Sequence, residues 1–232
     1  MPHTNEDLQK DVLNAIKWEP LLHAAEIGVT AKDGIITLTG VVDSYAKKLE
    51  AETAAKNVVG VKAVVEAIEI KFDGIGEKTD NEVADDVLTA LKWHWQFWSD
   101  QIKIKVEQGW VTLEGELTWN YQREAAKNAI IQVKGVKGIN NEIKLKTETQ
   151  DEVEKITIEQ ALVRSSLINA KDIQIEVNHN KVILTGKVHS FAQKNEVERI
   201  AWSAAGVEAI DNQLDIRYIN EYVDSFGYYS LI

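Results

Sequence analysis

The chain has 232 residues, of which 44% are hydrophobic and 27% charged, a composition typical of a globular protein. Its net charge of −11 repels nucleic acid and anionic lipid on average, so binding to either would require a local basic patch. The chain has no cysteine, which excludes disulfide frameworks, thiolate nucleophiles and cysteine-ligated metals.

The chain opens with a predicted helix, and two later segments repeat its pattern. Each begins with a possible capping box, a threonine followed three positions later by an acidic residue. The three pairs are Thr4 and Asp7, Thr79 and Glu82, and Thr149 and Glu152. Apolar residues then follow at helical spacing. They are Leu8, Val12, Leu13 and Ile16; Val83, Val87, Leu88 and Leu91; and Val153, Ile156, Ile158 and Leu162.

After each helix, two alternating strands separated by a short turn predict a β-hairpin. The turns lie at residues 33–34, 108–109 and 178–180. We expect Gly34, Gly109 and Asn180 to share one backbone conformation with a positive φ angle. The second strand of each hairpin also has a glycine in its apolar row, which suggests the close approach of a helix. These glycines are Gly40, Gly115 and Gly186.

A second helix, rich in small residues, follows each hairpin and can pack tightly on the sheet. The residues of its apolar face are Ala51, Ala54, Ala55 and Val58; Ala126, Ala129, Ile130 and Val133; and Val197, Ile200, Ala201 and Ala204. Ser44 and Ser190 are predicted N-caps. A second set of glycines is predicted to stop these helices, before a last strand in each unit. These are Gly60, Gly135 and Gly206.

The order of elements is therefore α-β-β-α-β, repeated three times. This predicts an α/β (α+β) fold of three tandem modules, each a small three-stranded mixed sheet packed on two helices. The predicted domains are residues 1–73, 74–147 and 148–219, and an aromatic C-terminal tail follows at 220–232. We expect this tail to pack on the body or on a partner. Modules of this size have marginal cores, so docking between neighbours is expected to add stability.

These residues resemble the OsmY-like BON-domain family, in its form with three tandem domains. The resemblance is carried by the run Ile-Ile-Thr-Leu-Thr-Gly-Val-Val at 35–42, by the small-residue helix, and by Gly-Val-Lys-Ala-Val at 60–64. All three units match in order, over about residues 5–218. The resemblance implies a non-enzymatic module without a cofactor, whose motif glycines are structural. It also implies association with phospholipid membranes or hydrophobic ligands, in osmotic or envelope stress.

The chain starts at Met1 without a basic or apolar signal segment, and no stretch of about 18 apolar residues occurs. If Met1 is the native start, these features predict a cytoplasmic protein. The periplasm, where OsmY-like relatives are found, is the alternative if the native start differs.

The densest cluster of aromatic residues lies at 93–98, at the end of the second module's first helix. Its large side chains are Trp93, Trp95, Phe97 and Trp98. They cannot all face one core, so some must contact a neighbouring module, solvent, a ligand or lipid. Packing between modules is the favoured interpretation, and a lipid or hydrophobic-ligand site is the functional alternative.

No other motif indicates chemistry. The five histidines have no metal-ligand spacing, and no nucleophile or nucleotide-binding motif occurs. The Gly-Val-Lys-Gly run at 135–138 resembles a nucleic-acid clamp, but it joins a helix to a strand, so no nucleic-acid partner is expected. Lys47, Lys48, Arg123 and Lys127 are interpreted as solvated.

The sequence thus predicts a binding protein with no catalytic residues and no metal. The leading hypothesis is association with a phospholipid surface or hydrophobic ligand under osmotic or envelope stress. The alternative is a soluble stress-related scaffold for protein interactions, which self-associates through aromatic surfaces into a homo-oligomer or with a protein partner. Ile35, Val41 and Trp110 are expected on the outer sheet faces, where something should cover them.

Overall fold

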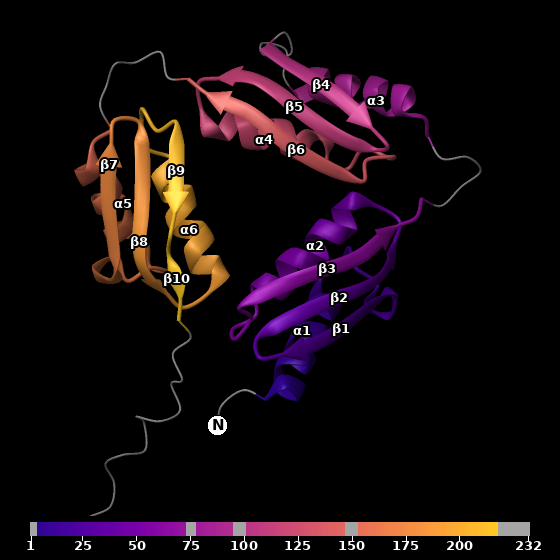
Figure 1. Ribbon diagram of the computed structural model, residues 1–232, viewed down its shortest axis with the longest axis horizontal. Coiled ribbons are helices and arrows are strands. Elements are labelled where there is room, and N and C mark those ends of the chain that lie inside the picture. The colour runs from indigo at the N-terminus through magenta and orange to yellow at the C-terminus, as the bar shows by residue number, and fades with distance from the viewer. Residues whose placement is uncertain (1–3, 73–77, 95–100, 147–152, 218–232) are drawn as a thin grey trace, which may run out of the picture.

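The computed structural model describes residues 4–72, 78–94, 101–146 and 153–217. Three modules follow one another along the chain, each with the order helix, hairpin, helix, strand (Figure 1). The predicted fold of three tandem modules is confirmed. The expected C-terminal tail, 220–232, lies outside the described residues.

The first module comprises α1 (Asn5–Trp18), β1 (Ile27–Lys32), β2 (Ile35–Val42), α2 (Tyr45–Lys56) and β3 (Ala63–Ile70). The second comprises α3 (Asp80–His94), β4 (Ile102–Glu107), β5 (Trp110–Leu117), α4 (Asn120–Ile130) and β6 (Gly138–Leu145). The third comprises α5 (Lys155–Arg164), β7 (Ile173–Asn178), β8 (Lys181–Val188), α6 (Phe191–Trp202), β9 (Ala209–Asn212) and β10 (Asp215–Ile216). Short 3-10 helices precede β1 (Ala24–Glu26) and β7 (Ala170–Asp172).

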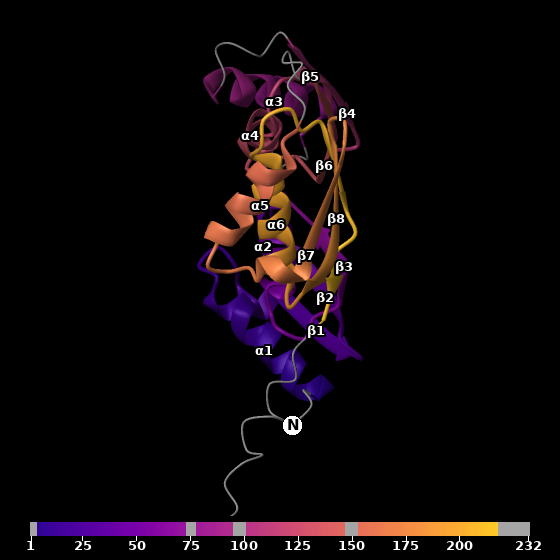
Figure 2. The ribbon, with the colours of Figure 1, turned by 90° about the vertical axis from the view of Figure 1, so that its left-hand side faces the viewer.

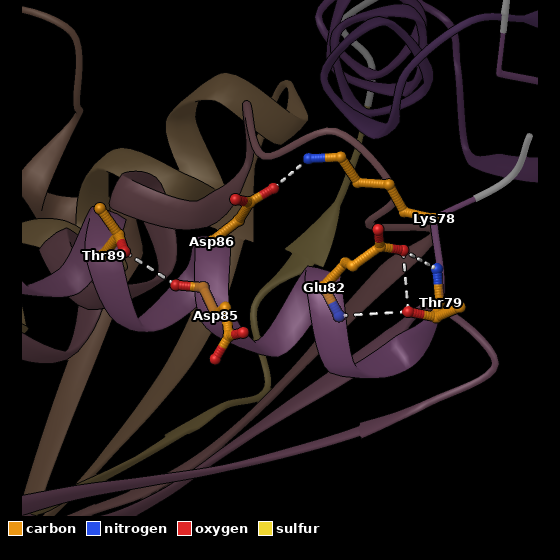
Figure 3. A network of polar contacts seen from close by, with 6 residues as sticks. All are labelled: Lys78, Thr79, Glu82, Asp85, Asp86 and Thr89. Atoms are coloured by element: carbon orange, nitrogen blue, oxygen red, sulfur yellow. Dashed lines mark hydrogen bonds and ion pairs between the residues drawn. The ribbon is translucent and has the colours of Figure 1, made fainter. Parts of the chain in front are cut away.

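In two modules, side chains that accept hydrogen bonds from free backbone N–H groups fix the start of the first helix. Thr4 and Asp7 form a reciprocal capping box at α1. At α3, the backbone N–H of Glu82 donates to Thr79 Oγ1, and the Glu82 carboxylate accepts from the Thr79 backbone (Figure 3). These bonds hold the pKa of Glu82 below its usual range. In the same turns, Lys78 pairs with Asp86 (Figure 3).

The predicted capping box at residues 149 and 152 is wrong as the start of the third module's first helix. The helix begins at Lys155, after an N-cap at Glu154 that makes no side-chain capping bond. Val153 precedes the helix and is already buried in the core. The apolar anchor therefore comes before the first helical turn instead of inside it.

In each module the hairpin is antiparallel and the last strand returns parallel to its central strand. In the first module, for example, Val29 pairs with Leu38 across β1 and β2, and Leu38 pairs with Glu66 across β2 and β3. The last strand of the third module is divided into β9 and β10, which pair with β8 in one continuous register. Each sheet is thus mixed, as predicted.

The glycine in each central strand is required by a close backbone contact, but not with a helix as predicted. Gly40, Gly115 and Gly186 have φ angles of 135°, 148° and 123°. A Cβ atom at these positions would overlap the carbonyl oxygen of the residue before the neighbouring strand. Those carbonyls belong to Glu26, Gln101 and Asp172. The backbone just before the neighbouring strand, and not the second helix of the module, therefore excludes a side chain at these positions.

The hairpin turns also differ from the prediction in one detail. Gly34 and Gly109 have positive φ angles, but Asn180 does not. The positive φ angle that all three turns share lies one residue earlier, at Asp33, Gln108 and His179. Asn180 instead uses its side chain, which donates from Nδ2 to the carbonyl of Gly206 at 2.8 Å.

The second helices cover one face of each sheet and fill the core with small residues. Ser44 and Ser190 cap α2 and α6, as predicted, by accepting from the N–H groups of Lys47 and Gln193. Gly60, Gly135 and Gly206 have positive φ, but they lie four or five residues beyond the helix ends, in the turn that leads to the last strand. The fully buried aliphatic side chains of each core contribute roughly 1.5–3 kcal/mol each. The largest of them include Ile36, Leu38, Leu113, Ile130 and Leu184.

The three modules lie around a common centre, and α2, α4 and α6 lie on the inner side of their modules (Figure 1). Viewed from the side, the helices lie on one side of the molecule and the sheets on the other (Figure 2). No helix within the described ranges is long and apolar enough to cross a membrane.

Candidate functional site

Two described first helices end in exposed apolar side chains next to a basic residue. In α1, Trp18 is 86% exposed and follows Lys17. In α5, Val163 is 72% exposed and precedes Arg164. Neither helix buries these groups, although each could have carried polar residues there at no cost. We call these ends, with the equivalent end of α3, the helix tips.

The loops after the helix tips also carry exposed apolar side chains. Leu21 and Leu167 occupy equivalent positions in the first and third modules, and both are exposed, Leu167 by 63%. In the second module, Lys92 is exposed and precedes Trp93, as Lys17 precedes Trp18. Trp93 lies one residue before the end of α3, but its side chain and residues 95–100 lie outside what the structure describes. The predicted site of Trp93, Trp95, Phe97 and Trp98 is therefore untested.

The helices α1, α3 and α5 all lie on the helix side of the molecule (Figure 2), so their tips belong to the same layer. Tryptophan has an apolar body and a polar N–H, and lysine and arginine extend their charge from an apolar stem. This is the pairing found where proteins meet the boundary between hydrocarbon and lipid headgroups.

The outer sheet face differs sharply between modules. Ile35, Val41 and Trp110 are exposed there, as predicted. In the first module this face carries one charged residue along β2 and β3; its residues are Ile35, Thr37, Thr39, Val41, Ala63, Val65, Ala67 and Glu69. In the second module the corresponding residues include four charged ones; they are Trp110, Thr112, Glu114, Glu116, Gly138, Asn140, Glu142 and Lys144.

In two of the second helices, α2 and α6, the first residue packs against another module. Tyr45, which begins α2, packs against the core of the second module, and Phe191, which begins α6, packs against the core of the first. The backbone of Ile139 forms a hydrogen bond with the Tyr45 phenol, and burial raises the pKa of this phenol. We call these contacts, each formed by a second helix and the module it touches, the joints.

The joint between the second and third modules is built differently. The residue equivalent to Tyr45 and Phe191 is Asn120, whose Oδ1 is buried and accepts no hydrogen bond. Contact is made instead by Arg123, whose guanidinium lies 4.5 Å from the ring centre of Trp202. Burial lowers the pKa of Arg123, so the interpretation of this residue as solvated is wrong. The same interpretation is wrong for Lys47 and Lys48, whose side chains are 13% and 23% exposed and pair with Asp43 and Glu66.

Arg123 also departs from its equivalents. Lys48 and Lys194 donate to carbonyls of their own sheets, at Ile68 and Leu214, with lengths of 3.0 and 2.8 Å. A guanidinium stacks on an aromatic face more readily than an ammonium does, so the arginine suits a contact with another module.

A hollow of about 450 Å³ lies at this joint, between α4 and α6. Its aromatic lining consists of Trp119, Tyr121 and Trp202, and its polar lining includes Asn120, Asn128, Glu124, Arg199 and Ser203. Sequence reasoning missed this site. Its only signal is the alignment of Tyr45, Asn120 and Phe191, in which one aromatic residue of three is replaced by an amide.

Several ionisable groups of the described residues form surface ion pairs. The pKa of Asp43 is lowered by Lys47, that of Glu196 by Arg199, and that of Asp211 by Lys181. No cluster of three or more metal-ligating side chains occurs among the residues placed by the structure.

The fold defines a class of protein: tandem small α+β modules joined through their second helices. A family model described as BON domain matches residues 4–71, 79–147 and 151–218. The chain belongs to the BON domain family.

The chain is also similar to osmotically-inducible protein Y of Escherichia coli (strain K12). The two are 28% identical over 157 residues, which cover 62% of this chain and 78% of that protein. This similarity supports the OsmY-like resemblance.

Among solved structures, the chain is similar to CdsD, a structural protein of the type III secretion system of Chlamydia trachomatis. Identity is 19%, the TM-score is 0.25, and the match covers 93% of this chain and 94% of that one. For the PrgH periplasmic domain, identity is 9% and the TM-score 0.20, with 88% and 99% of the two chains covered. TM-scores this low carry no argument about the arrangement of modules.

Proposed function

We propose that this chain is a non-catalytic BON-domain protein that associates with phospholipid surfaces through its helix tips. The observation that carries the proposal is the repeated pair of a basic and an apolar residue at the tips. Lys17 with Trp18, Lys92 with Trp93, and Arg164 with Val163 are the three pairs. The name of the similar osmotically-inducible protein supports a role in osmotic stress.

Three tips in one layer allow weak contacts to act together. One exposed tryptophan gives little affinity alone, but a second and third contact made by the same molecule become intramolecular and raise the overall affinity. The net charge of −11 opposes approach to an anionic surface, and the basic residues at the tips reduce this repulsion where contact occurs. The aromatic residues at 93–98 are included in the proposal as the tip of the second module.

Co-sedimentation with liposomes tests the proposal. The full chain is mixed with vesicles of phosphatidylcholine alone or with phosphatidylglycerol, and compared with a variant carrying Trp18→Ser and Leu167→Ser. Both side chains are exposed, so thermal melting should not change. We expect the bound fraction of the variant to be at most half that of the parent. Binding of the parent to anionic vesicles should also decrease at high salt, because salt screens the charges.

Tyr121→Ser is the matched control, because Tyr121 is also exposed but lies at the joint. Replacement of Trp93, Trp95, Phe97 and Trp98 by serine extends the test to the second tip. If the parent binds neither vesicle, or if all variants bind as the parent does, the proposal is wrong.

Self-association is a second candidate function, supported by the apolar residues Ile35, Val41 and Val65 on the outer sheet face of the first module. Among the described strands, the last strand of this module, β3, pairs only with β2 and therefore has an open edge. Exposed edges with apolar faces favour pairing with another chain. Light scattering should show an oligomer that Val65→Lys dissociates, whereas Asn140→Lys at the equivalent position of the second module has no effect. A parent that is monomeric at all concentrations contradicts this candidate.

The cytoplasm is the proposed location, and the periplasm is the alternative. Cell fractionation with a periplasmic marker distinguishes the two.

A further inference from the structure

The hollow between α4 and α6 has a structural cause. At the other two joints an aromatic side chain at the first position of the second helix packs on the neighbouring core. At this joint the corresponding residue is Asn120, which is smaller and leaves space. The space is about 450 Å³, within the size range of small-molecule sites.

The hollow also contains an unmet hydrogen-bonding requirement. Asn120 lines it, and the Oδ1 atom of this residue is buried without a donor. A buried acceptor without a partner destabilises the protein, so such an atom calls for an explanation in the structure. A ligand that carries a hydroxyl or amide N–H could supply the missing donor.

The lining favours a ligand with flat apolar surfaces and many polar edges. Trp119, Tyr121 and Trp202 offer aromatic surfaces, and Tyr121 is 62% exposed. Around them lie two amides, a carboxylate, a guanidinium and hydroxyls. A hydrocarbon chain would leave the buried Oδ1 of Asn120 without a hydrogen-bond donor, which is unfavourable.

Charge disfavours an ionic ligand. A quaternary ammonium would be repelled by the positive charges of Arg123, which lies over Trp202, and of Arg199, which lines the same hollow. An anion would need a free cation, but Arg199 donates from Nε and Nη2 to Glu196, both at 2.7 Å, and Glu124 adds a negative charge to the lining.

We propose that this hollow is a binding site for a neutral saccharide, held between the second and third modules. The less polar face of a sugar ring would stack on Trp119 or Tyr121, and its hydroxyls would reach Asn120 and the surrounding polar groups. This site is separate from the helix tips and does not depend on the proposed membrane association.

Titration of the full chain with three trisaccharides, maltotriose, cellotriose and chitotriose, tests the proposal by calorimetry and tryptophan fluorescence. We expect at least one to bind at or below about 1 mM. Tyr121→Ala should weaken this binding at least tenfold without changing the melting temperature. Asn120→Phe should fill the hollow and abolish binding, and Trp18→Ala, at a helix tip, should leave it unchanged.

Choline, adenosine and dihexanoylphosphatidylcholine are titrated in parallel. If none of the trisaccharides binds at roughly ten times that concentration, or if Tyr121→Ala binds them as the parent does, the proposal is overturned. It is also overturned if one of the other three compounds binds in a Tyr121-dependent way and the sugars do not. Tyr121→Ala keeps the test valid even if Asn120→Phe fails to fold.

Discussion

Two joints in this molecule are filled and one is hollow, although all three are built from equivalent helices. Tyr45 and Phe191 close their joints with an aromatic ring on a neighbouring core. Asn120 leaves space, and Arg123 and Trp202 make the contact beside it. The difference teaches that repeated modules can keep one core while a single position between them changes from packing to a possible binding site.

The contrast extends to the lysines and arginine of the second helices. Lys48 and Lys194 donate to their own sheets and so stabilise their own modules. The guanidinium of Arg123 instead stacks on Trp202 of the adjacent module. The second module has therefore exchanged an internal contact for an external one.

The largest effect should come from the central-strand glycines, which belong to the modules and not to the joints. Gly40→Ala, Gly115→Ala and Gly186→Ala should each lower the free energy of unfolding by roughly 2–4 kcal/mol, because positive φ and overlap with a backbone carbonyl act together. Urea unfolding measures this, with Thr39→Ala as a control on the exposed face. Unchanged midpoints would show that the carbonyl contact is not as close as described.

Removal of an aromatic ring from a filled joint should have the next largest effect. Phe191→Ala should cost about 1–3 kcal/mol, less than for a fully buried phenylalanine, because the ring is only partly buried. Small-angle scattering should also show a larger radius of gyration as the joint opens. Phe191→Leu should restore most of the loss. A compact Phe191→Ala variant with the stability of the parent would mean that this joint contributes nothing.

Arg123→Lys should destabilise the hollow joint only, by about 0.5–1 kcal/mol, because an ammonium stacks less well on Trp202. The fluorescence of the chain should change as Trp202 loses its neighbour. Lys127→Ala, one turn further along α4, is the control and should change neither quantity. Equal effects from the two variants would argue against a specific stacking contact.

The smallest effect concerns pH at the joint of the first and second modules. The pKa of Tyr45 is raised above its usual value near 10, mainly by burial and also by Glu52. The neutral phenol is therefore favoured in the folded state, and its contribution is complete below about pH 10 and lost as the pH rises through the raised pKa. Tyr45→Phe should flatten the fall in unfolding free energy above pH 10. A parent and variant with the same alkaline profile would contradict this.

Much of the fold could be predicted because its determinants are local. Alternation, helical spacing, capping threonines and serines, and glycine positions are all encoded within one module, and repetition made each pattern visible three times. The capping box at Thr79 and the caps at Ser44 and Ser190 are examples. The partner of Gly40 was mistaken because spacing shows that a side chain is excluded, but not which neighbour excludes it.

The joints could not be predicted in the same way. They depend on how one module meets the next, and no periodicity records that. Arg123 was placed among solvated residues because charge on a helix usually faces water, yet the aromatic ring that covers it lies 79 positions further along the chain. Only a comparison of equivalent residues, such as Asn120 with Phe191, would have drawn attention to the site.

The separation of helices and sheets onto opposite sides (Figure 2) gives the molecule two distinct faces. If the helix tips rest on a bilayer, the sheets are turned away from it. The outer face of the first module, with its exposed apolar residues, then stays available to a second protein while the contact with the bilayer is maintained. Such a molecule would work as an adaptor, holding a lipid surface on one face and a partner on the other, with neither occupant competing for the same residues.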